Sequence, residues 1–171
     1  TGVLKRLKGF GTKKILVNDI ETNRELDSKY KLEWTSKEKI YKEADIISLH
    51  TPLTQLTKNM IRKEHLLTMK PDMIIINTSR GGIINEHDLY EVMLSGHLSG
   101  AAIDVFEKEP YDGPLKEIER CLLTAHMGSM SVDCRTRMEI ESTEEAIRFL
   151  TGKKLESEVP QEEYDVQSQG L

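Results

Sequence analysis

Residues 69–85, MKPDMIIINTSRGGIIN, place an apolar run directly before a polar turn that contains two glycines. The run includes three consecutive isoleucines, Ile74, Ile75 and Ile76, a pattern typical of a strand that is buried on both faces. Such strands belong to parallel sheets that helices cover on both sides. This segment therefore predicts an α/β fold with a parallel sheet at its centre.

The same alternation of strand and helix signals extends from this segment toward both ends of the chain. Short apolar, β-branched runs predict strands at residues 14–19, 31–34, 44–50, 72–78, 99–105 and 121–124. We expect one helix capped by Thr35 with Glu38, one capped by Asn85 and ending at Gly96, and one at residues 132–150. This order predicts a doubly wound parallel sheet of the Rossmann-like class.

Length and composition limit the possible functions. The chain has 171 residues and a formal net charge of −5, so we expect one globular domain at residues 1–150 and no nucleic-acid partner. Residues 151–171 are polar and are expected to form a C-terminal tail. No apolar run approaches the roughly 20 residues that span a bilayer, so we expect a cytoplasmic protein without membrane contact. Cys121 and Cys134 lack the spacing of a metal site, and no metal is expected.

The candidate site consists of polar residues that follow the predicted strands, because ligands of open α/β sheets bind outside the carboxyl ends of strands. Arg80 follows the isoleucine strand, and a guanidinium can bind a carboxylate through two hydrogen bonds. His126 follows the last strand and can transfer a proton near neutral pH. Glu109 is a candidate carboxylate partner for that histidine. The alternatives are a solvated Arg-Gly turn, a capped loop histidine and a solvated glutamate.

Two further strand ends point to a nucleotide cofactor. Asp19 ends the first predicted strand, where an acidic residue can accept hydrogen bonds from an adenosine ribose and favour NAD over NADP. An ordinary turn aspartate explains this residue equally well. His50 ends another strand two residues before Pro52 and can line a ligand cleft.

Four motifs, taken together and in this order, resemble the nucleotide-binding domain of the D-isomer-specific 2-hydroxyacid dehydrogenases. They are ADIISLHTPLT at 44–54, MKPDMIIINTSRGGIIN at 69–85, LSGAAIDVFEKEP at 98–110 and LLTAHMGS at 122–129. The resemblance covers about residues 3–150. It implies that Arg80 binds the substrate carboxylate and carbonyl, that His126 is the acid/base, and that Glu109 orients this histidine.

The same resemblance implies an NAD site. Asp19 matches the ribose ligand, and Asp104 matches the residue that holds the nicotinamide carboxamide. The remaining matched positions line the cofactor cleft in relatives, and they are His50, Thr51, Pro52, Thr78, Ser79 and Gly128.

The implied activity is hydride transfer between NAD(H) and a small D-2-hydroxy acid or 2-keto acid, in a protein that is a homodimer. An alternative from another class is an NAD(H)-sensing binding protein that resembles the corepressors of this family, and a third is an inactive gene product. Within the enzymes, formate-type dehydrogenases have glutamine at the position of Glu109, which argues against them. Phosphonate oxidation stays open, because its enzymes keep the same three residues.

The chain departs from the family pattern in two places. Ala125 stands where relatives usually have a proline before the histidine, which loosens the backbone without removing a functional group. The glycine fingerprint G-x-G-x-x-G, the strand before it and a substrate domain of about 100 residues would all precede Thr1. We therefore expect a fragment that lacks the first, central strand and its glycine loop and that binds NAD poorly by itself.

Overall fold

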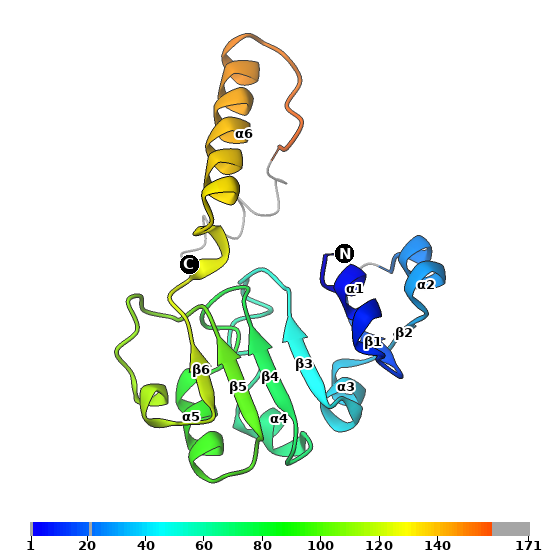
Figure 1. The fold of residues 1–171 in the computed structure, drawn as a ribbon, viewed down its shortest axis with the longest axis vertical. Helices are drawn as coiled ribbons and strands as arrows, with labels where there is room; N and C mark the ends of the chain where they lie inside the picture. The colour runs from blue at the N-terminus through cyan, green and yellow to red at the C-terminus, as the bar shows by residue number, and fades with distance from the viewer. Residues whose placement is uncertain (1, 21, 159–171) are drawn as a thin grey trace.

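The computed structural model describes residues 2–20 and 22–158 and contains six parallel strands in two sheets (Figure 1). The first sheet pairs β1 (Ile15–Val17) with β2 (Leu32–Trp34). The second has the order β3-β4-β5-β6, formed by Ile46–Leu49, Ile74–Asn77, Gly100–Ile103 and Cys121–Leu123. All six predicted strands are confirmed, each within the predicted residues.

The two sheets are separate hydrogen-bonded units. β1 pairs only with β2 among the described residues, and β3 pairs only with β4. In Figure 1 the first sheet lies beside the β3 edge of the second, together with the N-terminal helices. The predicted parallel α/β architecture is therefore confirmed, and the described strands form two separate sheets.

Helices connect the strands in the order that a parallel sheet requires. The α-helices are α1 (Gly2–Leu7), α2 (Arg24–Tyr30), α3 (Lys37–Glu43), α4 (Lys63–Thr68), α5 (Glu86–Leu94) and α6 (Val132–Leu150). Three short 3-10 helices occupy Lys8–Phe10, Pro114–Glu117 and Met127–Ser129. The predicted helix at residues 132–150 is confirmed; none of its described residues is buried, and it extends away from the sheet in Figure 1.

The predicted helix caps are confirmed in one case and wrong in the other. The Asn85 side chain accepts a hydrogen bond from the Asp88 amide at 3.0 Å, as expected for the start of α5. The expected cap at Thr35 is wrong, because Ser36 caps α3 by accepting from the Lys39 amide. The physical reason lies beside the sheet, since the Thr35 amide donates to the Val17 carbonyl and its backbone is therefore still held against β1.

The main core lies between the four-stranded sheet and the helices α4 and α5. Ile75 belongs to one apolar cluster with Leu66 of α4 and Leu89 of α5, and all three are almost fully buried. The prediction that the isoleucine strand is buried on both faces is wrong, because Ile74 on the opposite face is 37% exposed. Side chains of a strand alternate between faces, and α4 and α5 cover only the face of Ile75.

This core predicts a large difference between two leucines of α5. Leu89→Ala removes a side chain that is 1% exposed, and we expect it to lower the free energy of unfolding by about 2–5 kcal/mol. Leu94→Ala is the matched control on the same helix, since Leu94 is 63% exposed and its loss should change stability by roughly 0.5 kcal/mol or less. Urea unfolding of both variants measures this, and equal losses would contradict the assigned core.

Candidate active site

The carboxyl ends of β4, β5 and β6 lie at one edge of the sheet, where the arrowheads point in Figure 1. The loops that follow these strands carry Arg80, Glu109 and His126 respectively. Parallel pairing thus places three segments that are far apart in the sequence next to one another. The helix α6 begins just after the last of these loops.

His126 and Glu109 form a direct pair at this edge. Nδ1 of His126 lies 2.9 Å from Oε2 of Glu109, and the side chains are 47% and 36% exposed. The other carboxylate oxygen of Glu109 accepts the Phe106 amide at 3.0 Å. The hydrogen bond with His126 first, and that amide second, hold the pKa of Glu109 below its usual value. Because Nδ1 is engaged, Nε2 is the nitrogen that can exchange a proton with a ligand.

Asp104 fixes the backbone on both sides of the histidine. Its carbonyl accepts the His126 amide at 2.8 Å, and its buried carboxylate accepts the Met127 amide at 2.8 Å and the Thr124 hydroxyl. His126 itself has a φ of 53°, in the left-handed backbone region that residues other than glycine rarely adopt. These hydrogen bonds hold a strained residue in one conformation, a feature that often marks functional sites.

The Arg80 loop is shaped by a buried amide at the end of β4. The Asn77 side chain donates to the Arg80 carbonyl at 2.9 Å and accepts from the amide and the hydroxyl of Ser79 at 3.1 and 2.9 Å. The Arg80 guanidinium is exposed and donates to the Ser79 carbonyl at 2.6 Å. Within the described residues it makes no hydrogen bond to Glu109 or His126, so its loop is adjacent to theirs but Arg80 is not joined to the His126–Glu109 pair.

Gly81 brings the arginine loop against the glutamate loop. A Cβ atom at Gly81 would lie 2.0 Å from the carbonyl carbon of Phe106 and 2.5 Å from the nitrogen of Glu107, so only glycine fits. The sequence indicated a turn with two glycines, but Asn77 and Gly81 were not predicted as site residues. The signal for Asn77 was present, because a polar side chain that ends a buried strand must find hydrogen-bond partners.

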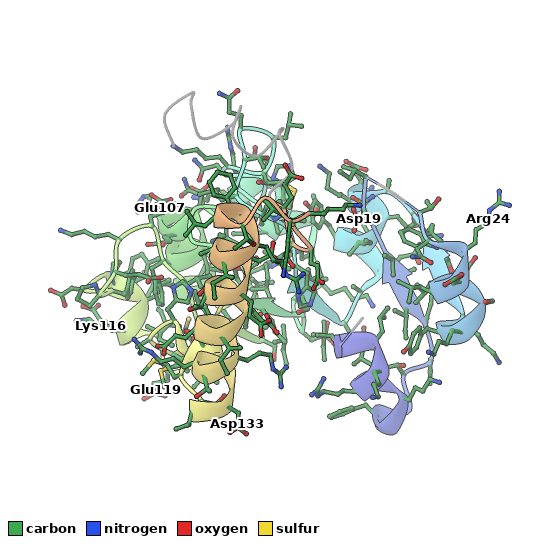
Figure 2. All side chains as sticks on the ribbon, turned by 90° about the horizontal axis from the view of Figure 1, so that it is seen from above. Asp19, Arg24, Glu107, Lys116, Glu119 and Asp133 are labelled. Carbon is green, nitrogen blue, oxygen red and sulfur yellow. The ribbon has the colours of Figure 1, made fainter. Side chains whose placement is uncertain are left out.

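The expected cofactor residues fall into two groups. Thr78 and Ser79 lie in the loop after β4, Asp104 opens the loop after β5, and Gly128 lies in the histidine loop after β6. Gly128 is exposed, with open space where a Cβ atom would lie. Asp19 is apart from them, since it follows β1 in the other sheet and its carboxylate accepts the Ile20 amide at 2.7 Å. In Figure 2 Asp19 lies with the N-terminal elements and Glu107 with the four-stranded sheet.

The turn after β3 carries the remaining expected positions. Nε2 of His50 lies 2.9 Å from the Ser48 hydroxyl, and partial burial lowers the pKa of this histidine. The Pro52 carbonyl accepts the Thr57 hydroxyl at 2.6 Å. The Thr51 hydroxyl is buried and has no hydrogen-bond partner in the described part of the chain.

Metal-binding clusters and membrane-spanning helices are both absent from the part of the chain that the structure describes. No group of three or more His, Cys, Asp or Glu side chains among residues 2–20 and 22–158 is arranged to hold a metal ion. No helix in the same ranges is both long and apolar enough to cross a membrane.

Comparison with known proteins identifies the group of proteins that this chain resembles. Residues 1–128 match the family model described as D-isomer specific 2-hydroxyacid dehydrogenase, NAD binding domain. A glyoxylate reductase of Korarchaeum cryptofilum is 38% identical over 171 residues, which are 99% of this chain and 51% of that protein.

Solved structures of the same group have the same fold. A glyoxylate reductase from Paecilomyes thermophila superposes with a TM-score of 0.86 at 27% identity, covering 94% of this chain and 48% of that one. A D-lactate dehydrogenase from Aquifex aeolicus, solved in complex with NAD and lactic acid, superposes with a TM-score of 0.78 at 29% identity, covering 88% and 50%. The chain spans about half the length of these relatives. The chain therefore belongs to the D-isomer specific 2-hydroxyacid dehydrogenase family and contains residues of its NAD binding domain.

Proposed function

We propose that the protein containing this chain is an NAD-dependent oxidoreductase that interconverts a small D-2-hydroxy acid and the corresponding 2-keto acid. The observation that carries this proposal is the His126–Glu109 pair, held at 2.9 Å at the carboxyl edge of the sheet in a chain of this family. The related glyoxylate reductases support a small 2-keto acid such as glyoxylate as the substrate class.

The described residues fit NAD in two places. The Thr51 hydroxyl is buried beside the sheet edge without a protein partner, which suits a polar group of a bound ligand. Asp19 uses one carboxylate oxygen in its own turn and is exposed, so it can accept a ribose hydroxyl at the end of β1. When bound, NAD supplies or accepts the hydride at the 2-carbon of the substrate.

The side chains of the chain supply the proton and the charge. In the reducing direction, Nε2 of His126 donates a proton to the carbonyl oxygen of the 2-keto acid. Glu109 accepts a hydrogen bond from Nδ1 of His126 and stabilises the imidazolium before the proton leaves. Arg80 turns its exposed guanidinium from the Ser79 carbonyl to the substrate carboxylate, which its planar fork can bind with two hydrogen bonds.

We also propose that the protein is a cytoplasmic homodimer. The proposal is supported by the resemblance to the family. Exposed apolar side chains on α6, such as Ile147 and Leu150, offer surface that a larger assembly can cover. Light scattering coupled to size-exclusion chromatography gives the mass in solution, which tests the homodimer.

Replacing the proposed acid/base should remove most of the activity. We expect His126→Gln to lower kcat for NADH oxidation by a panel of 2-keto acids by roughly 10²–10⁴-fold, because the transferred proton then has no donor. His87→Gln is the matched control, since His87 is exposed on α5 and should leave kcat unchanged. If the unaltered protein turned over none of the acids while binding NADH, the enzyme proposal would fail and a dinucleotide-sensing role would be favoured.

The pair also predicts a titration that does not depend on turnover. His126→Ala should raise the pKa of Glu109 toward its ordinary value of about 4.5, because the hydrogen bond from His126 is the main cause of its lowering. Carbon-13 NMR of the Glu109 carboxyl group measures this shift. Since the folded-state pKa is lowered, the bond stabilises the fold above about pH 4.5 and this contribution is lost as the pH falls through the lowered pKa. An unchanged Glu109 pKa in the variant would show that the pair is not formed.

A further inference from the structure

Glu86 forms a hydrogen bond that connects α5 to the glutamate loop. Its Oε1 atom accepts the backbone amide of Glu107 at 2.6 Å, although the two residues are 21 positions apart. Glu86 is the first residue of α5, and that helix is fixed in the core by Leu89, Val92 and Met93. The carboxylate is therefore a rigid acceptor that reaches out to a loop.

The Phe106–Glu107 peptide is held from two directions. Gly81 packs against it so closely that a Cβ atom there would lie 2.1 Å from the Phe106 carbonyl oxygen. The Glu86 carboxylate engages the amide of the same peptide. The Phe106 ring adds a third restraint, because it stacks on Tyr111 with ring centroids 4.1 Å apart. A backbone segment with these restraints has little freedom to move.

This held segment is the one that supports Glu109. The Phe106 amide donates to Oε1 of Glu109 at 3.0 Å, while Oε2 of Glu109 lies 2.9 Å from Nδ1 of His126. A rotation of the Phe106–Glu107 region would displace the amide on which the Glu109 carboxylate rests. The bond between Glu86 and the Glu107 amide is thus one peptide away from the amide that supports Glu109.

We propose that Glu86 is a positioning residue, which holds the Phe106–Glu107 peptide and through it sets the Glu109 carboxylate against His126. The expected effect on kcat rests on the proposed dehydrogenase function. The expected effect on the placement of Glu109 rests on the hydrogen bonds alone. Burial, and then the nearby Glu107 and Glu109 charges, raise the pKa of Glu86, against the lowering effect of the Glu107 amide. The hydrogen bond from the Glu107 amide offsets part of the cost of placing the Glu86 carboxylate in these surroundings.

Four variants separate this role from a general effect of charge or stability. Glu86→Ala removes the acceptor oxygen, and Glu86→Asp keeps the charge at the first turn of α5 while withdrawing the acceptor by one methylene. Glu86→Gln keeps a carbonyl oxygen at the original reach. Glu91→Ala is the matched control, because Glu91 is on the same helix and pairs with Lys63 away from the site.

Kinetics of the full protein with NADH and glyoxylate give the first measurement. We expect Glu86→Ala and Glu86→Asp to lower kcat by about tenfold, the loss that a misplaced charged hydrogen bond typically causes, with KM changed by less than about twofold. Glu86→Gln should restore kcat to within about threefold of the unaltered protein, and Glu91→Ala should match it. If Glu86→Ala lowered kcat no more than Glu91→Ala does, the proposal would be overturned.

NMR titration of the Glu109 carboxyl group gives a second measurement that needs no turnover. Glu86→Ala and Glu86→Asp should raise the pKa of Glu109 toward its ordinary value, because its bond to His126 is weakened, and Glu86→Gln should return it. An unchanged Glu109 pKa in the Ala and Asp variants, with folding verified by circular dichroism, would overturn the positioning role. An inactive unaltered protein that shows these pKa changes would instead contradict only the dehydrogenase function.

Discussion

Parallel pairing of β4, β5 and β6 is the constraint on which the site depends. Ile75 pairs with Ala101, and Ala101 pairs with Cys121, so the three strands end together at one edge of the sheet. The core under α4 and α5 fixes that register, since a shift of one residue would turn Ile75 out of the apolar cluster. Hydrophobic burial on one face thus decides which loops meet at the edge.

Polar residues then convert the strand ends into loops of defined shape. Asn77 shapes the arginine loop, Asp104 holds both sides of His126, and Glu86 holds the peptide next to the one whose amide supports Glu109. Each of these side chains binds backbone groups, so its effect is to position a neighbouring residue. The His126–Glu109 bond is the point at which these contacts converge, and it engages one of the two imidazole nitrogens.

The strands were predictable because their signals are local runs of apolar residues, and the Asn85 cap was predictable because capping uses adjacent residues. The exposure of Ile74 was not, since it depends on which face the helices cover. The structure places Glu109 and His126 2.9 Å apart, a contact that the spacing of two residues 17 positions apart could not predict. The contact partner of Gly81 and the role of Glu86 were missed because both involve a loop more than 20 positions away.

A crystal structure of the full protein with NAD and oxamate, an unreactive analogue of a 2-keto acid, tests the proposed chemistry most directly. We predict that Nε2 of His126 lies within about 3 Å of the oxamate carbonyl oxygen, that Nδ1 stays on Glu109, and that Arg80 binds the carboxylate through two nitrogens. Oxamate bound elsewhere, or bound here with Nε2 turned away from its carbonyl, would contradict the roles proposed for these three residues.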